Sequence, residues 1–523
     1  MTELDPSLLT TCPYRRAICQ VMPRLLALYD ADPLSPTYGQ GDRYRWAWKL
    51  IDFGNGTFQG AAHGLARLLA HCLLPEGLAE SAVLRRLDAM FHGAEALRYP
   101  NGSMEEAFPF EASFCVTALV AYDLLSAIEL LGDRLPEERR RRHLAVVRPM
   151  IAFLLRHDEH HAFISNHMAT AVVALYKWTA LTQEPGEDRG KLFLDRILAA
   201  QSAEGWFREY EGADPGYQTL CTYYLADLHR LRPDLGLAEP LARSVRFLWH
   251  FAHPDGSFGG LYGSRNTRFY YPAGLEALAA EVPEAAALAT FMRRAIATQA
   301  VVTLEALDEP NLIPMFNSYC WAAAIAAEGP LPEAPPVPAE APGTWRREFP
   351  QAGLIVDRSP AHYTVISWHK GGVVYHFPQA GPPRIDAGAV ARTARGALYS
   401  SQAYRPDNAL RLEGEALSVT APMTAMHKQL PTPVQFIVLR LLNTTVMRHA
   451  GMGNFVKKLL VRMLITGQSA APARNRRTIR LGPAIAIEDA WVHGALERLA
   501  TDRPFSAIHM ASQGYWQRQD DAS

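Results

Sequence analysis

Four groups of polar residues lie beside apolar segments with helical spacing, and each group carries side chains that can bind a ligand or move a proton. The first group is the segment 101–111, in which Glu106 and Glu111 come directly before a long apolar stretch. Carboxylates at the start of a helix stabilise the helix itself through its dipole, and they equally bind sugar hydroxyls or a cation. Glu106 and Glu111 are therefore candidate substrate-binding residues.

A second group, Ser-Asn-His at 165–167, opens the helix predicted over 166–182. Serine and asparagine are ordinary helix N-caps. A histidine directly after them is less usual, because its side chain points toward whatever faces the start of the helix. Asn166 and His167 are therefore candidate catalytic residues.

The third group is the segment 209–218. Its Asp-Pro pair at 214–215 is a strong helix start, which places Tyr217 in the first turn, pointing toward the same end as His167. A phenol with a pKa of about 10 is a poor base at neutral pH, and it becomes useful where a cation or a helix N-terminus favours the phenolate. Tyr217 is a candidate catalytic residue, and Tyr223, one to two turns further on, is a candidate substrate-binding residue.

The fourth group, 262–271, supplies such cations. It sets two arginines beside tyrosines and a Gly-Ser turn, which is typical of a carboxylate clamp. An arginine-rich surface loop is the alternative interpretation. The candidate substrate-binding residues of this group are Arg265, Asn266, Arg268 and Tyr271.

Histidines and cysteines give little indication of a metal. His157 and His161 are four residues apart, as two ligands on one helix can be, but no His-Glu-x-x-His motif follows. The six cysteines stand far apart without a Cys-x-x-Cys pair, so neither a zinc cluster nor a disulfide framework is predicted. We expect no metal and no other cofactor, with a divalent ion on the two histidines as the alternative.

The elements that must position these groups are helices over the first two thirds of the chain. Apolar residues recur with i, i+3 and i+4 spacing in 58–75, 110–131, 136–157, 166–182, 188–201, 218–231, 235–252, 284–306 and 317–327. Short glycine-containing turns of similar composition, as at 101–103 and 255–257, separate these segments. Repeated helix pairs of this kind predict a ring or solenoid whose loops converge on one cleft.

Beyond the helices the pattern changes. Residues 329–343 contain six prolines and predict a stiff, extended linker. The β-branched and aromatic runs that predict antiparallel strands are 353–357, 363–368 and 372–377. Further short runs that fit a β-sandwich are 417–420, 478–481 and 484–487.

The stretch 435–466 allows two interpretations, because five basic residues interrupt strongly apolar sequence. It forms either strands or a basic amphipathic helix that lies on a membrane surface. The second interpretation predicts a peripheral membrane contact.

Charge is unevenly distributed. Residues 346–523 hold 22 Lys and Arg against 12 Asp and Glu, a net charge of +10, which leaves −11 for residues 1–345. A basic surface attracts polyanions through its field, and nucleic acid, anionic lipid and acidic polysaccharide all qualify. Docking of the basic part on the acidic part is the alternative.

The beginning of the sequence lacks a basic segment followed by an apolar one, and no run of about 18 charge-free apolar residues occurs. We therefore expect no secretory signal, no membrane-spanning helix and a cytoplasmic protein.

Together these segments resemble the heparinase II/III-like polysaccharide lyases, which consist of an α/α toroid followed by a β-sandwich. The resemblance rests on Asn166-His167 at a helix start and on Asp-Pro-Gly-Tyr-Gln at 214–218, which is similar to the family's Ser-Pro-x-Tyr-His segment. It rests also on the strand block 353–388. The domains it implies are a catalytic toroid at 1–328, a linker at 329–344 and an antiparallel β-sandwich at 345–523.

The resemblance implies β-elimination at a uronic acid. A base removes the proton at C5, the 4-O-glycosidic bond breaks, and an unsaturated sugar remains. Such a carbon acid is too weak unless the neighbouring carboxylate is neutralised. In the family, residues matching Asn166 or His167 do this, and the residue matching Tyr217 is the general base, the general acid or both. The implied partner is an anionic polysaccharide of capsule or exopolysaccharide metabolism and not nucleic acid.

The sequence departs from the family in two places. The family's His-x-His-x-Asp stretch is reduced to His376, a further candidate catalytic residue, and its histidine after the tyrosine is Gln218. A non-catalytic glycan-binding or assembly protein is one alternative. A glycoside hydrolase that uses Glu106 or Glu111 with Asp214 is another. A terpene cyclase-like protein is a third alternative; it would need a DxDD motif or a metal-bound diphosphate site, and the sequence lacks DxDD.

Overall fold

The structure is a computed structural model of the chain. The residues it describes are 12–47, 51–160, 162–413, 416–426, 432–461, 470–501, 503–508, 510 and 513–517.

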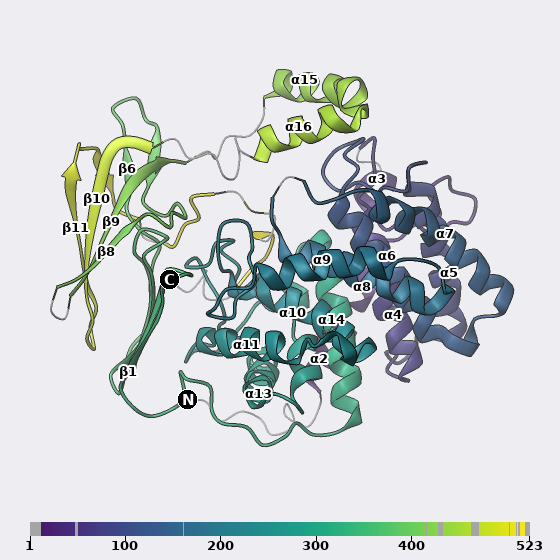
Figure 1. Ribbon diagram of the computed structural model, residues 1–523, viewed down its shortest axis with the longest axis horizontal. Coiled ribbons are helices and arrows are strands. Elements are labelled where there is room, and N and C mark those ends of the chain that lie inside the picture. Colours follow the sequence, from purple (N-terminus) through teal and green to yellow (C-terminus); the bar gives the residue numbers. More distant parts are fainter. Residues whose placement is uncertain are drawn as a thin grey trace.

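Six helices form a closed inner ring in the first part of the chain (Figure 1). They are α4 (Ala61–Ala70), α6 (Phe114–Leu131), α8 (Ser165–Thr182), α10 (Pro215–Leu231), α12 (Ala273–Leu278) and α14 (Glu309–Glu328). Each contacts the next, and α14 packs against α4, so the ring closes. The inner helices are almost entirely buried, as their apolar composition requires.

An outer helix packs against each member of this ring. The outer helices are α2 (Pro13–Leu26), α5 (Glu80–Leu97), α7 (Glu137–Arg156), α9 (Glu187–Ala199), α11 (Ala238–Leu248) and α13 (Pro283–Ala297), and a single turn, α3 (Arg43–Trp46), precedes α4. Because an outer helix returns the chain between consecutive inner helices, all inner helices run in one direction. Their N-termini therefore lie at one end of the toroid, together with the loops that precede them.

Helix α6 also has a property that the sequence did not predict. The segment Phe114–Arg134 is long and apolar enough to cross a membrane by length and composition, although it contains charged residues. Within the toroid 83% of its most apolar window is buried, as in the core helix of a globular domain.

Twelve strands follow in the described part of the chain and form two antiparallel sheets, which confirms the predicted fold class. The first sheet has the order β1 (Trp345–Phe349), β2 (Leu354–Ser359), β3 (His362–Ser367), β4 (Val373–Pro378) and β5 (Arg384–Asp386). The path of the second is β11 (Ala486–His493), β10 (Ala470–Arg480), β9 (Ala416–Ala425), β7 (Leu398–Ser400), β6 (Val390–Arg392) and β12 (Glu497–Leu499). Strand β8 (Ala409–Glu413) pairs with β9 off this path.

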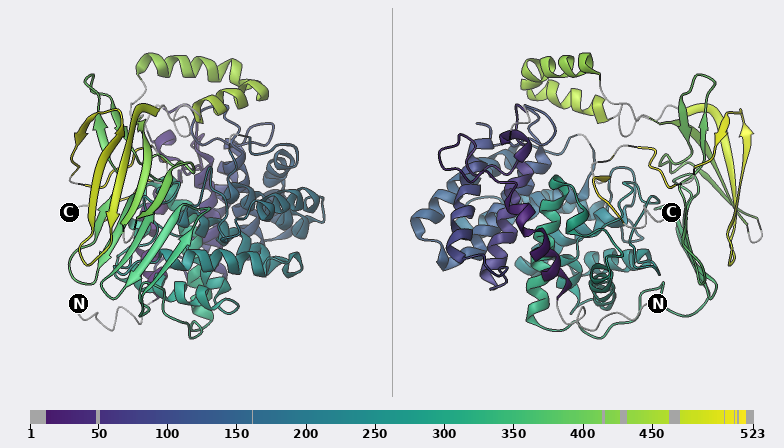
Figure 2. Two further views of the ribbon diagram at one scale, coloured as in Figure 1. Left: turned by 60° about the vertical axis from the view of Figure 1, so that its left-hand side comes forward. Right: turned by 180° about the vertical axis from the view of Figure 1, so that it is seen from behind.

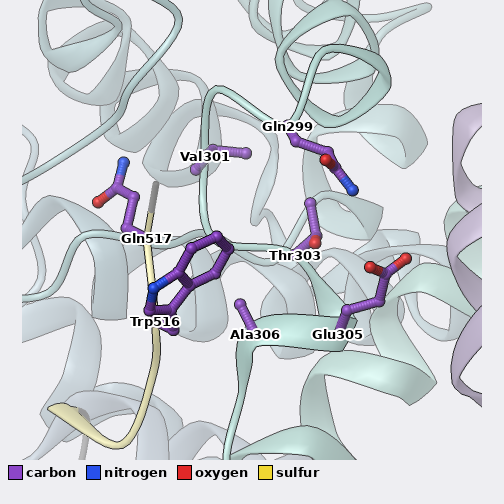
Figure 3. Close-up of a pocket in the computed structure, with 7 residues that line it drawn as sticks. All are labelled: Gln299, Val301, Thr303, Glu305, Ala306, Trp516 and Gln517. Carbon is purple, nitrogen blue, oxygen red and sulfur yellow. The ribbon is translucent and has the colours of Figure 1, made fainter. Parts of the chain in front are cut away.

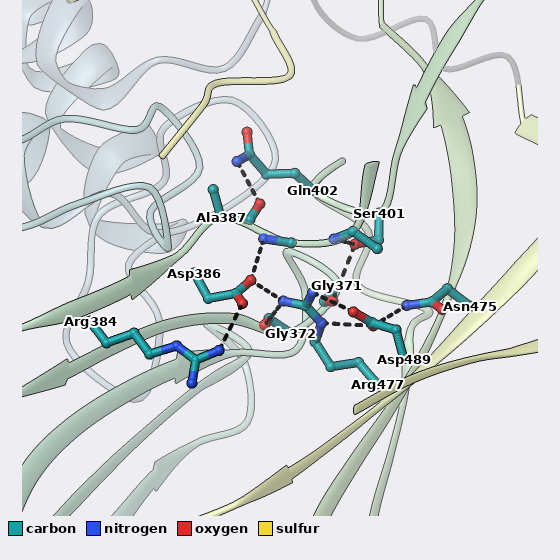
Figure 4. Close-up of polar contacts among 12 residues, drawn as sticks. Gly371, Gly372, Arg384, Asp386, Ala387, Ser401, Gln402, Asn475, Arg477 and Asp489 are labelled. Atoms are coloured by element: carbon teal, nitrogen blue, oxygen red, sulfur yellow. Dashed lines mark hydrogen bonds and ion pairs between the residues drawn. The ribbon is translucent and has the colours of Figure 1, made fainter. Parts of the chain in front are cut away.

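A buried arginine joins the two sheets (Figure 4). Arg477, on β10, donates to both carboxylate oxygens of Asp489 on β11 at 2.8 and 3.0 Å. It also forms an ion pair with Asp386 at the end of β5 and donates to the Gly372 carbonyl at 3.2 Å. Because a buried charge needs such partners, this network fixes how one sheet lies on the other.

The first sheet also packs on the toroid (Figure 2), so both faces of its strands β3 and β4 are buried. Tyr363 donates to the His250 carbonyl at 2.6 Å, and Tyr375 accepts from the Leu261 amide at 3.0 Å. Residues of odd number on β3 and β4 face the toroid, while even-numbered ones such as Val374 join the core between the sheets. The strand period of two thus divides this sheet between two cores.

The insertion between β9 and β10 is helical where the structure describes it, so the interpretation of 435–466 as strands is wrong there. It forms α15 (Pro433–Thr444), with a capping box at Thr432, and α16 (Ala450–Val461). The remainder of the predicted stretch, from residue 462, lies outside the described residues.

Candidate active site

One carboxylate positions two of the predicted site residues. Asp214 caps α10 by accepting from the Tyr217 amide at 3.0 Å through Oδ1, as the Asp-Pro pair predicts. Its other oxygen, Oδ2, accepts from the Arg265 amide at 2.8 Å. Asp214 is fully buried. The start of α10 and the loop before α12 are therefore held together at the end of the toroid where the inner helices begin.

The Arg265 guanidinium lies against two tyrosine rings. It is 4.6 Å from the ring centre of Tyr217 and 4.4 Å from that of Tyr210, the geometry of a cation–π contact. Burial disfavours the charged form, but the surrounding tyrosines and acids outweigh it and raise the pKa of Arg265. Tyr217 is partly exposed. A permanent cation thus stands beside a phenol that ligands can approach.

Asn166 is held in place by a glutamate from the neighbouring hairpin. Its Nδ2 donates to Glu209 Oε2 at 2.8 Å, and its amide N–H donates to Oε1 at 3.2 Å. Glu209 is fully buried, and burial raises its pKa to about 8, against the opposing effect of Arg265. Through these two hydrogen bonds the carboxyl group fixes the start of α8 beside the loop that leads to α10.

His167 has an acidic partner of its own. Its Nδ1 lies 2.8 Å from Glu159 Oε2, and the imidazole is 16% exposed while Glu159 is buried. A carboxylate on one ring nitrogen orients the imidazole. Glu159 also acts electrostatically on Tyr210, so the histidine belongs to the same cluster as Arg265.

The β-sandwich contributes a lysine to the loop that carries Arg265. Lys370, in the turn between β3 and β4, donates to Asn266 Oδ1 at 2.7 Å, and Asn266 Nδ2 donates to Ser506 Oγ at 2.8 Å. Burial lowers the pKa of Lys370 to about 7, against the opposing effect of Asp214. Asn266 has a φ of +59°, a left-handed conformation that asparagine tolerates. The sandwich thus fixes the backbone next to Arg265.

Four predicted site residues lie elsewhere or face inward. Tyr223 is buried in the ring, with the Tyr122 hydroxyl 3.4 Å from its own. Asn266 is fully buried in the contact with Lys370, and Tyr271 is buried with its ring edge-to-face against Phe269. These side chains therefore support the site from behind, and the prediction that they touch substrate is corrected.

His376 is the fourth, and the strand period explains its position. On β4 it faces the core between the two sheets, where its Nδ1 lies 2.8 Å from Thr364 Oγ1 and its Nε2 lies 3.5 Å from the Pro483 carbonyl. The adjacent Tyr375 faces the toroid instead. The structure therefore does not bring His376 to the cluster, and its predicted catalytic role is corrected.

The acidic segment before α6 lies at the same end of the toroid. Glu111 accepts from the backbone amides of Glu106 and Ala107 at 3.0 and 2.8 Å and so closes its own loop. Glu106 is exposed and acts electrostatically on Tyr210. Arg268 is partly exposed on the loop of Arg265. Glu106 and Arg268 thus lie at the rim of the cluster.

Only one histidine of the possible metal pair lies among the described residues. His157 stacks on Phe153, with its Nδ1 2.9 Å from the Phe153 carbonyl, and His161 lies outside the described residues. Among the residues that the structure describes, no group of three or more His, Cys, Asp or Glu side chains is arranged to hold a metal ion.

Sequence reasoning missed several members of the cluster. Glu209 and Tyr210 belong to the third polar segment, but nothing in their spacing distinguished them from Glu211. Glu159 and Lys370 had no signal at all, because each reaches the site only through the tertiary fold.

Two small cavities lie away from this cluster. One, of about 180 Å³, lies between residues 299–306 and the C-terminal segment, which lines it with Trp516 and Gln517 (Figure 3). The other, of about 260 Å³, lies between α13 and the proline-rich segment. Neither is lined by a predicted site residue.

The fold is similar to those of solved polysaccharide lyases. The Streptomyces coelicolor A3 chondroitin AC lyase in complex with chondroitin sulphate has a TM-score of 0.56 at 14% identity, covering 93% of this chain and 67% of that chain. A tyrosine-to-alanine variant of that enzyme has a TM-score of 0.51 at 15% identity, covering 91% and 66%. A Paenibacillus xanthan lyase has a TM-score of 0.46 at 11% identity, covering 91% and 47%.

This chain thus spans about two thirds of the length of the chondroitin lyase. At such low identity the similarity establishes the fold alone, a toroid followed by a β-sandwich. No protein-family model matches the sequence, and no curated protein matches it at a significant level. The heparinase II/III-like family remains a prediction.

Proposed function

We propose that this protein is a polysaccharide lyase that cleaves an anionic glycan containing uronic acid by β-elimination. The observation that carries the proposal is the Arg265 guanidinium against the ring of Tyr217, at the end of the toroid where six helices begin. The fold it shares with chondroitin AC lyase supports this choice of reaction class. An enzyme of this kind would act in capsule or exopolysaccharide metabolism.

The reaction requires a site that stabilises negative charge. Loss of the C5 proton leaves an electron pair that delocalises onto the neighbouring carboxylate, so the site must neutralise that group as the charge develops. Arg265 supplies a fixed positive charge, and the N-termini of the inner helices add partial positive charge at the same end. His167, which Glu159 orients, is the group we assign to the substrate carboxylate, and Asn166, which is buried and bonded to Glu209, supports the site from behind.

Tyr217 is the group we assign to proton transfer. A cation beside a phenol favours the phenolate, which is the form able to accept the C5 proton. The C–H electron pair then forms the C4–C5 double bond, and the C4–O4 bond breaks with its electron pair on O4. O4 takes a proton, which Tyr217 has just acquired, so the enzyme returns to its starting state.

The geometry disfavours the hydrolase that uses Asp214. A glycosidase needs two carboxyl groups on either side of the scissile bond. Asp214 is buried, and its two oxygens accept from the backbone amides of Tyr217 and Arg265. It is therefore committed to holding the loops.

The proposal is tested with a panel of anionic glycans, including chondroitin and other uronic-acid polymers. Cleavage by elimination produces an unsaturated uronide that absorbs in the ultraviolet, whereas hydrolysis produces reducing ends without this absorbance. We expect ultraviolet-absorbing product from at least one polymer and at least a hundredfold less with Tyr217→Phe. Tyr223→Phe is the matched control, because it removes a hydroxyl from the same helix inside the ring. Binding without product on every polymer would instead identify a glycan-binding protein.

A further inference from the structure

The helical hairpin of α15 and α16, residues 433–461, presents apolar side chains to solvent. Eight of them are at least 47% exposed. They are Val434, Phe436, Ile437, Val438, Leu441, Met452, Phe455 and Leu459. Exposed apolar residues scattered singly are normal, but a group on one hairpin marks an interaction surface.

Basic residues fix this hairpin to the toroid. Arg440 forms an ion pair with Asp52 at 2.8 Å, and its guanidinium lies 5.5 Å from the ring centre of Phe53. Arg448 lies 4.4 Å from the ring centre of Phe110. These partners precede α4 and α6, so the hairpin sits at the end of the toroid that carries the candidate site (Figure 1).

The charge of the hairpin indicates what covers its apolar surface. Residues 433–461 contain no Asp or Glu and four Lys and Arg, of which Arg440 and Arg448 contact the toroid while Lys457 and Lys458 lie on α16. A surface of this composition is complementary to anionic lipid headgroups, while two copies of it repel each other. Apolar side chains beside such cations are typical of a helix that lies in the plane of a membrane interface.

We propose that the 433–461 hairpin anchors the protein on a membrane surface that contains anionic phospholipids. Each helix has 12 residues and is about 18 Å long, too short for a hydrocarbon core of about 30 Å. The hairpin therefore lies within the interface without crossing it. This anchoring would hold the end of the toroid that carries the candidate site beside the membrane, but it does not depend on the proposed lyase activity.

Vesicle flotation with the full chain tests the proposal. One set of vesicles contains phosphatidylcholine alone and the other contains phosphatidylcholine with phosphatidylglycerol. We expect the wild type to float with the anionic vesicles, and the double variant Ile437→Ser/Phe455→Ser to lose at least tenfold in bound fraction. Lys457→Glu/Lys458→Glu is expected to remove the preference for anionic vesicles.

The matched control is Leu34→Ser/Leu192→Ser, which removes two exposed leucines outside the hairpin and should leave flotation unchanged. Thermal unfolding of each variant verifies that it is folded. Flotation that is absent in the wild type, or unchanged in Ile437→Ser/Phe455→Ser, would overturn the proposal. A dimer by light scattering that Ile437→Ser/Phe455→Ser makes monomeric, without flotation, would assign the surface to a second copy instead.

Discussion

The guanidinium of Arg265 lies 4.6 Å from the ring centre of Tyr217, and the two oxygens of Asp214 hold the backbones of both residues. The two residues are 48 positions apart in sequence, on different hairpins of the toroid. Their contact is therefore a product of the ring architecture, which brings the starts of α10 and α12 together.

Replacing Asp214 by asparagine should weaken both of these connections. The amide can accept from one backbone N–H, but its NH₂ group then faces the other donor. We expect the D214N variant to lose about 1–3 kcal/mol of unfolding free energy, the usual effect of an unsatisfied buried group. Denaturant unfolding measures this loss, and product formation should fall with it. A variant with wild-type stability and activity would show that Asp214 does not organise the site.

Arg265→Lys should reduce turnover although it conserves charge. Lysine lacks the planar guanidinium that stacks on the rings of Tyr210 and Tyr217. We expect kcat to fall at least tenfold, measured on whichever glycan the wild type cleaves. Arg268→Lys, on the same loop, should affect KM more than kcat, because Arg268 lies at the rim. Equal losses in the two variants would contradict a special role for Arg265.

Lys370 should make stability depend on pH. Burial lowers its pKa from 10.5 to about 7 in the folded protein, so between these values the unfolded chain binds more protons and stability rises with pH. The slope from one proton is at most about 1.4 kcal/mol per pH unit. Lys370→Met should flatten this dependence of the unfolding free energy on pH, which chemical denaturation at pH 7 to 10 measures.

Glu209 also makes stability depend on pH. Because it is present in both wild type and Lys370→Met, its contribution cancels when the two proteins are compared. The raised pKa of that carboxyl group, about 8, makes stability fall between pH 4.5 and 8, the opposite sign. An unchanged slope in Lys370→Met would mean that the lysine keeps its ordinary pKa.

The two histidines that the sequence singled out should differ. His167→Asn is expected to lower turnover at least tenfold, because the imidazole faces the cluster and is partly exposed. His376→Asn should lower the unfolding temperature while the activity per folded molecule stays within twofold, since its side chain lies between the sheets. Steady-state kinetics separates loss of turnover from loss of stability when the enzyme concentration is taken from active-site titration or corrected for the folded fraction. Loss of turnover in His376→Asn at full stability would restore it to the site.

Short-range sequence patterns predicted most of the helices and strands. The Asp-Pro pair at 214–215 gave the start of α10, and the strands containing 353–357, 363–368 and 372–377 are present. Helices α2, α5 and α12 were not among the predicted segments. Helix α12 has only six residues, and so short a helix depends on its neighbours in the ring.

The rest depends on contacts between distant residues. From the sequence, His376 and Tyr375 are equally plausible as the residue that faces the toroid. Both faces of their strand are buried, and no polar alternation indicates which face is which. Lys370 reaches Asn266 only after the sandwich docks on the toroid. The stretch around α15 has an apolar pattern that suits a strand as well as an interfacial helix, and periodicity alone does not separate the two.

The ultraviolet absorbance of product released from a uronic-acid glycan, measured in parallel for wild type and Tyr217→Phe, tests the central claim most directly. The account predicts absorbance for the wild type, at least a hundredfold less for Tyr217→Phe, and unchanged glycan affinity in both. Product at the wild-type rate from Tyr217→Phe would contradict it, because the proton at C5 would then leave without this phenol.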